Sequence, residues 1–199
     1  MSVVAGFNSH PAEAKIIGGI VAGYGDLEFA LTWCVSQING DFDSTFKAIY
    51  RVRGETNRID IADALARSFL SPSAIRTLFE ETIAAMRWCL KIRNQYAHCN
   101  WINTGSGLLF VNLEEVARED AVIELGTLTQ HHAELSLLKK QLTYFEWVDH
   151  CLSYLNIDAQ VRAGKLRRNH LSKPTKLRRP ELNAPTPDFE PLLTPKKRR

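Results

Sequence analysis

The residue types best suited to chemistry lie together in the segment Arg93-Asn94-Gln95-Tyr96-Ala97-His98. A histidine can act as a general acid or base, and an arginine can hold an anion. Asn94 precedes His98 by about one helical turn, so its amide could fix the orientation of the imidazole. Arg93 and His98, in contrast, are about 140° apart around a regular helix. For both to reach one substrate, the helix must tighten or end near His98, or a second chain must contribute.

A long helix is expected to position this segment, because mostly apolar residues recur before it at steps of three and four. They are Ile75, Phe79, Thr82, Met86 and Cys89. This spacing predicts one buried face. The same steps lead on to Arg93 and Tyr96, so the arginine should also point inward. A buried guanidinium is costly without a partner, and we therefore expect Arg93 to meet an acidic group, a backbone carbonyl or a ligand anion.

Other periodic stretches predict a helical body around that helix. The expected helices cover about residues 11–39, 43–52, 59–70 and 72–101, and a last one that starts at Thr127 or Thr129 and continues to about Leu155. Two short strands, 108–113 and 121–125, are possible between them. The predicted fold class is therefore all-α, with room for a short β-hairpin.

The composition indicates one folded domain with a tail of different character. The chain has 199 residues, 45% hydrophobic and 24% charged, which is ordinary for a globular protein. Residues 162–199 carry 12 basic and three acidic residues, whereas the rest carry 13 and 19, and six of the eight prolines lie in that basic part. We expect a flexible N-terminus over residues 1–9, a helical domain over 10–164 and a disordered, proline-rich basic tail over 165–199.

Several classes of protein are not expected. No apolar run is long enough to span a bilayer, and the N-terminus lacks the pattern of a signal peptide. Widely spaced cysteines favour free thiols and no metal site; they are Cys34, Cys89, Cys99 and Cys151. These features predict a cytoplasmic protein without a cofactor.

The stretch from Lys91 to His98 resembles the signature of the HEPN superfamily, in which an arginine and a polar residue precede a histidine by a few positions. The surroundings are similar as well: a helical body, a long first helix with an acidic residue (Asp26 or Glu28), and the motif at the end of a central helix. The chain also looks like a bacterial family that shares an Arg-Asn-x-Tyr-Ala-His-Cys motif.

This resemblance implies a HEPN-like helical bundle and a metal-independent endoribonuclease of toxin or phage-defence type. It would work on RNA as a homodimer, with both motifs lining one cleft. His98 would be the general acid or base, Arg93 would bind the phosphate and Asn94 would orient the histidine. The supporting residues implied are Tyr96, which would shape the cleft, and Glu28 or Asp26, which would anchor the arginine.

The alternative is a non-catalytic module, since fold does not fix function. Mannitol-operon repressor-like proteins carry a similar Arg-Asn-x-Phe-Ala-His stretch and are regulators. A HEPN-like regulatory module of this kind would bind a nucleotide, a nucleic acid or a protein partner.

The basic tail has two interpretations. Basic residues spaced by prolines could bind nucleic acid without sequence preference, which we favour by a small margin. The tail could instead solubilise the chain, or dock on an acidic antitoxin or on the acidic body. The residues concerned are Arg167, Arg168, Arg178, Arg179, Lys196, Lys197, Arg198 and Arg199.

The remaining polar and aromatic residues are weaker candidates. His131-His132 is expected on the exposed surface of the last helix, and His150 is expected to pair with Glu146 at or near the surface. A solvated charged face is a better interpretation than an RNA groove for Arg51, Arg53 and Arg58. Core or interface positions are expected for Trp33, Trp88, Trp101 and Trp147.

Overall fold

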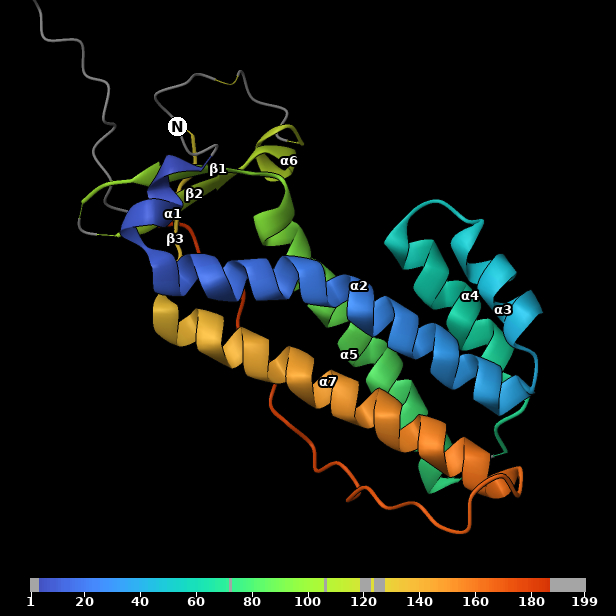
Figure 1. Ribbon diagram of the computed structural model, residues 1–199. Helices are drawn as coiled ribbons and strands as arrows, with labels where there is room; N and C mark the ends of the chain where they lie inside the picture. Colours follow the sequence, from blue (N-terminus) through green and yellow to red (C-terminus); the bar gives the residue numbers. More distant parts are fainter. Residues whose placement is uncertain (1–3, 72, 106, 119–122, 124–127, 187–199) are drawn as a thin grey trace, which may run out of the picture.

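The computed structural model describes residues 4–71, 73–105, 107–118, 123 and 128–186 (Figure 1). Most of this part of the chain is helical, as the sequence predicts, and a small three-stranded sheet lies at one end of the helices. The expected helical class is thus confirmed in outline, and the sheet is larger than the expected hairpin.

Three long helices form the centre of the molecule. α2 (Pro11–Asn39) and α7 (Leu135–Arg162) run side by side in the same direction, and α5 (Ala74–Ala97) runs the opposite way (Figure 1). α2 ends where predicted, because Gly40 has a φ of 80°, a conformation that glycine adopts without strain.

α3 (Phe42–Tyr50) and α4 (Glu55–Arg67) form a helical hairpin beside α2. α3 begins before the expected start at residue 43, because the carboxylate of Asp41 accepts the backbone N–H of Ser44 and caps the helix. The helix predicted over 59–70 is α4, which begins and ends earlier. Both helices are therefore confirmed, with boundaries that differ by a few residues.

The sheet is antiparallel, with the strand order β1 (Cys99–Asn103), β2 (Leu108–Asn112) and β3 (His131–His132). β2 agrees with the strand predicted over 108–113. Its partners are β1 and β3, and most of the other predicted strand, 121–125, lies outside the described residues. The helix predicted over 72–101 ends earlier, and its last positions belong to β1. In the strand, Trp101 packs across the sheet against Phe110, which favours the strand over a continued helix.

Two short helices flank the sheet, α1 (Ala5–Ser9) and α6 (Leu113–Val116). The ring of Phe7 in α1 lies 5.0 Å from that of Trp101 in β1. Residues 4–9 therefore lie against the sheet, which differs from the flexible N-terminus expected over 1–9. Residues 1–3 lie outside the described residues.

The last helix starts later than predicted. It begins at Leu135 and not at Thr127 or Thr129, because His131 and His132 pair with β2 as a strand. The side chain of His131 is consequently buried in the sheet, so the prediction of an exposed helical histidine at this position is wrong.

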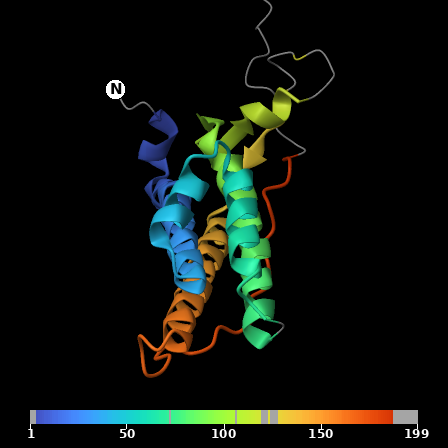
Figure 2. The ribbon, with the colours of Figure 1, turned by 90° about the vertical axis from the view of Figure 1, so that its right-hand side faces the viewer.

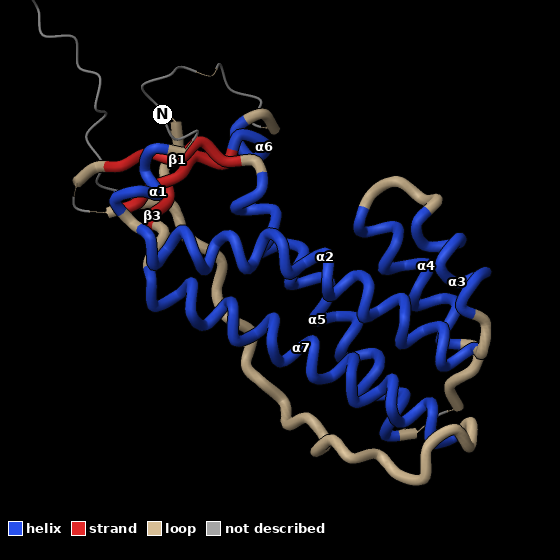
Figure 3. The backbone as a smooth tube through the Cα atoms, viewed as in Figure 1, coloured by secondary structure: helices blue, strands red, loops and turns tan. Residues whose placement is uncertain are grey.

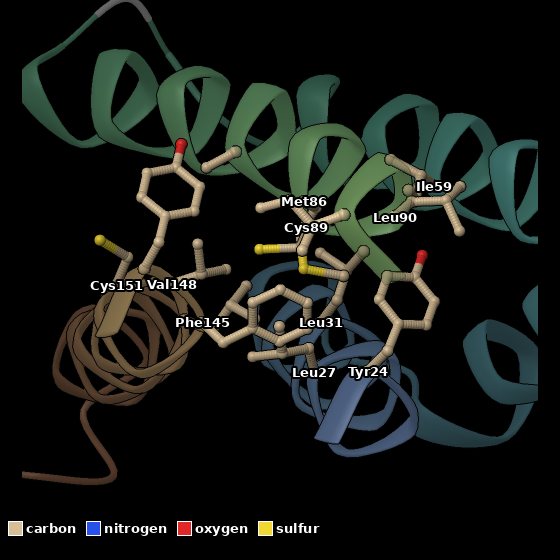
Figure 4. Packing of buried hydrophobic residues seen from close by; sticks show 14 of the residues in the cluster. Tyr24, Leu27, Leu31, Ile59, Met86, Cys89, Leu90, Phe145, Val148 and Cys151 are labelled. Carbon is tan, nitrogen blue, oxygen red and sulfur yellow. The ribbon is translucent and has the colours of Figure 1, made fainter. Parts of the chain in front are cut away.

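The core lies where α2, α5 and α7 meet, and Figure 4 shows Leu31, Met86 and Phe145 pointing toward one another from these helices. The inward face predicted for α5 is confirmed, because Phe79, Thr82, Met86 and Cys89 are at most 1% exposed. This packing fixes the rotation of α5, and with it the directions in which its last residues point.

All four cysteines are free, and three of them are buried: Cys34, Cys89 and Cys151. Within the described residues, no helix combines the length and apolar character needed to cross a membrane. In the same part of the chain, no group of three His, Cys, Asp or Glu side chains is placed to hold a metal ion.

The C-terminal segment differs most from the prediction. Residues 165–186 bend at the end of α7 and then run back along the helices to the sheet (Figures 1 and 2). There the N–H of Thr186 donates to the carbonyl of Gln130. The expected disordered tail is therefore wrong for residues 165–186, and residues 187–199 lie outside the described residues. We call residues 172–186 the strap.

Candidate functional site

His98 lies at the end of α5, as the motif predicts. The helix stops at Ala97, and His98 follows as its C-cap with φ −123° and ψ 46°. The carbonyl of His98 accepts the N–H of Leu113, which holds α6 beside it. The imidazole is 52% exposed, with its Nε2 3.5 Å from Oε1 of Glu114. A histidine so placed can reach a substrate while a carboxylate steadies its ring.

Glu114 is held near His98 by a capped helix. The side chain of Asn112 accepts the N–H groups of Glu114 and Glu115 and begins α6. Sequence reasoning missed this carboxylate, although an asparagine that ends a strand and precedes two glutamates is a usable sign of a helix start.

Arg93 meets an acidic group, which is one of the three kinds of partner expected, but this group is neither Glu28 nor Asp26. Its guanidinium lies 3.5 Å from the carboxylate of Glu55 on α4 and donates to the amide oxygen of Asn94 at 3.0 Å. The side chain is 23% exposed, and its buried Nε has no hydrogen-bond partner among the described residues. The guanidinium therefore keeps donors that are not engaged.

Neither Glu28 nor Asp26, the expected anchors, forms an ion pair with Arg93 among the described residues. Glu28 is buried and pairs with Arg58 at 2.9 Å, and Asp26 lies exposed on α2. Burial raises the pKa of the Glu28 carboxyl, and the attraction of Arg58 partly offsets that rise. Arg58 is thus the partner of a buried acid. The prediction that it lies on a solvated charged face is wrong.

Arg93 and His98 face different elements of the fold. Arg93 turns toward α4, whereas His98 turns toward α6. α5 stays α-helical to Ala97 and ends at His98, as one of the expected alternatives required, but the two side chains still meet carboxylates of different helices. One copy of the chain therefore supplies the two groups on separate surfaces.

Asn94 connects these two surfaces, because its amide binds Arg93 while it also lines a groove at the end of α5. The groove has a volume of about 370 Å³ and carries both signs of charge; its lining residues are Lys91, Asn94, Gln95, Asn112, Glu114, Glu115, Arg118 and Leu182. The amide oxygen of Asn94 accepts from Arg93, so the predicted pairing of Asn94 with His98 is not the one observed.

Tyr96 does not face this groove. It is 3% exposed, and its hydroxyl donates to Gln141 of α7 and accepts from the amide of Asn183 in the strap, both at 2.5 Å. Burial also raises the pKa of Tyr96. Within a single chain Tyr96 therefore does not shape a cleft, contrary to the prediction. It instead joins α5 to α7 and to the strap.

The basic residues of the tail have different surroundings. The guanidinium of Arg179 lies 5.4 Å from the ring centre of Trp88, a cation–π contact. Like Arg179, the others that the structure describes are exposed: Arg167, Arg168 and Arg178. The remaining candidates, Lys196, Lys197, Arg198 and Arg199, lie outside the described residues.

The weaker histidine candidates have structural partners. His131 stacks on Phe110 at 5.1 Å, and its Nε2 lies 3.6 Å from Glu115. His150 lies with Nε2 3.0 Å from the carbonyl of Ser172, so its observed partner is the strap and not Glu146.

An aromatic patch on α2 and α3 escaped the sequence analysis. It consists of Phe29, Trp33, Phe42, Phe46 and Tyr50. Successive rings lie 4.6–6.0 Å apart, and the first four side chains are 38–45% exposed. Spacings of four residues within each helix were the available signal. The rings together form an exposed apolar patch on the surface.

Comparison of the chain with protein-family models, with curated proteins and with solved structures finds no match.

Proposed function

We propose that the protein is a HEPN-like, metal-independent endoribonuclease of toxin or defence type. The observation that carries this proposal is the position of His98, which is half exposed at the end of a central helix. Its partner Glu114 lines a groove that Asn94 also lines, and Asn94 in turn binds Arg93. One helix end thus carries a general acid or base and an anion-binding group on different sides, beside an open groove.

The proposed reaction needs two proton transfers. One imidazole takes the proton of the ribose 2′-hydroxyl, whose oxygen attacks the phosphorus. The bond to the 5′-oxygen breaks, and a second imidazole donates the proton that this leaving oxygen requires. The products are a 2′,3′-cyclic phosphate and a 5′-hydroxyl end. Arg93 would stabilise the charge that develops on the phosphate.

Two copies of the chain would supply the base and the acid. One copy offers a single exposed histidine of this motif, on a different surface from its arginine. A symmetric dimer brings two His98 and two Arg93 side chains to one cleft, and substrate phosphate would compete with Glu55 for the guanidinium. The proposal therefore requires a homodimer.

We propose the aromatic patch as the contact between the two copies. Its surroundings carry both signs of charge, since Asp43 pairs with Lys47 at 2.6 Å and Arg51 follows at the end of α3. A symmetric contact places each sign opposite the other, which favours a second copy over a polyanion such as RNA. The patch also ends at Arg58, which lies over Tyr50 and binds Glu28.

We expect Trp33→Ser to weaken dimerisation by about 30-fold or more, because buried aromatic residues dominate interface energies. Size-exclusion chromatography with light scattering over a dilution series measures the change. Phe69→Ser is the matched control, since Phe69 is 58% exposed beyond the end of α4 and should leave the dimer intact. A wild-type chain that is monomeric throughout would contradict the dimer.

The test of the proposed activity is cleavage of labelled single-stranded and structured RNA in excess EDTA. Wild-type protein should cut, and both Arg93→Ala and His98→Ala should lose the activity. Cleavage that EDTA abolishes, or that both variants retain, would refute the proposed site. No cleavage by a dimeric wild-type protein would favour the second candidate below.

The second candidate function is a HEPN-like regulatory module that binds a nucleotide, nucleic acid or protein without catalysis. It is favoured by one observation: Arg93 and His98 each lie 3.5 Å from a carboxylate, Glu55 and Glu114. Such pairs also suit a structural role. Overexpression separates the candidates, because a nuclease should arrest growth unless His98 is replaced, whereas a binding module should not.

A further inference from the structure

Figure 3 shows the strap as a loop that runs beside the long helices. It is held to them as a peptide ligand would be, through its backbone carbonyls. Side-chain N–H groups of α5 and α7 donate to several of them. These bonds are Trp147 to Thr175 at 2.7 Å, Trp88 to Pro180 at 3.0 Å, Gln141 to Glu181 at 2.9 Å and Gln95 to Asn183 at 3.3 Å. Because every residue has a carbonyl, these donors recognise an extended backbone and not a particular sequence.

Two strap side chains add selectivity, since Pro180 and Asn183 are buried. The amide of Asn183 donates to the hydroxyl of Tyr96 at 2.5 Å, and its backbone N–H donates to Gln95 at 3.1 Å. The buried proline ring favours an extended conformation, as in known modes of proline-rich peptide recognition. The buried position of Asn183 requires a polar side chain of this size, because its amide donates to Tyr96.

Charge contributes at two further positions. Lys176 lies 3.1 Å from Glu81, and Arg179 lies over Trp88. The features recognised are therefore Lys-x-x-Arg-Pro-x-x-Asn, from residue 176 to residue 183. An opening of about 660 Å³ remains between residues 176–179 and the α5 and α7 side chains Glu81, Tyr144 and Trp147. The strap thus binds without filling its groove, which makes it easier to release than a core element.

We propose that this face of α5 and α7 is a peptide-binding site, which the chain's own strap occupies until a partner protein presents a competing segment. The partner segment is extended and basic, with a proline followed three residues later by asparagine. Leu182 lines the groove beside Asn94, so an exchanged segment would rest next to the candidate site. The proposal does not depend on the activity of that site.

The experiment measures binding of a labelled synthetic peptide with the sequence of residues 172–186 to the full-length chain. The attached strap competes at a high effective concentration, so binding to wild type should be weak. In an Asn183→Ala chain the attached strap loses its buried hydrogen bonds, and the wild-type peptide should bind about tenfold more tightly or better. A peptide that carries the same Asn183→Ala change should not show this increase in affinity for the variant chain.

A second variant of the chain keeps the test decisive if Asn183→Ala disturbs folding. Lys176→Glu with Arg179→Glu reverses two exposed strap charges and should also strengthen binding of the wild-type peptide. Lys173→Glu with Arg178→Glu, at exposed neighbours without these contacts, is the matched control and should leave the affinity unchanged. Folded variants that bind the peptide no more tightly than wild type, or that bind both peptides equally, would overturn the proposal.

Discussion

Replacing His98 by alanine is expected to slow RNA cleavage by about 10²–10⁴-fold, the usual cost of removing a general acid or base. The exposure of the imidazole, 52%, means that the change removes little packing, so the protein should remain folded. The measurement is the rate of cleavage of end-labelled RNA under single-turnover conditions in EDTA, with the thermal unfolding midpoint recorded in parallel.

The matched control for this prediction is His170→Ala. His170 is also exposed, but it lies in the segment after α7 and far along the chain from the motif. The His170→Ala variant should cut RNA at the wild-type rate. Equal rates for His98→Ala and wild type would show that the motif histidine is not the catalytic group. A loss in both variants would indicate a contaminating or indirect effect.

The helices could be predicted from the sequence, because their signals are local. Steps of three and four residues placed Phe79 and Met86 on the buried face of α5, and a proline and a glycine marked the ends of α2. The same spacing predicted that Arg93 needs a partner, with an acidic group as one of three possibilities, and Arg93 and His98 do meet different carboxylates.

The partners of these residues could not be predicted, because they depend on packing between distant segments. Glu28 was an equally suitable anchor for Arg93 by charge, but α4 brings Arg58 to it and leaves Glu55 for the motif arginine. β3 is another example, since the pairing of His131 depends on β2 and not on its neighbours in the sequence.

The strap shows why composition alone misled. A basic, proline-rich segment without apolar periodicity has no means of forming its own core, which is the usual sign of disorder. Its order instead comes from donors on other elements, such as Trp88 and Trp147, whose N–H groups need acceptors. No local pattern in residues 172–186 reports those donors.

Replacing Arg58 by alanine is expected to lower the free energy of unfolding by about 3 kcal/mol near neutral pH. The change leaves the carboxylate of Glu28, whose side chain is 8% exposed, without its partner. Arg58 is itself 26% exposed, so the effect should fall at the lower end of the range for broken buried pairs. Urea unfolding measures it, and Arg51→Ala, an exposed arginine nearby, should change stability by about 0.5 kcal/mol or less.

The pH dependence distinguishes an unpaired buried charge from lost packing. Burial raises the pKa of Glu28 above its ordinary value of 4.5, so the folded protein takes up this proton more readily than the unfolded chain. Stability from this group is therefore present at low pH and is lost as the pH rises through the folded-state pKa. Without Arg58 that pKa rises further, so the deficit of Arg58→Ala should shrink as the pH falls toward 4.5.

A second variant separates the same two causes at neutral pH. Glu28→Gln combined with Arg58→Ala removes the buried charge and should recover part of the lost stability, because a neutral amide costs less to bury than a carboxylate. A deficit that is independent of pH, and that the double variant retains in full, would mean that Arg58 acts through its packing on Tyr50, over which its guanidinium lies at 5.4 Å.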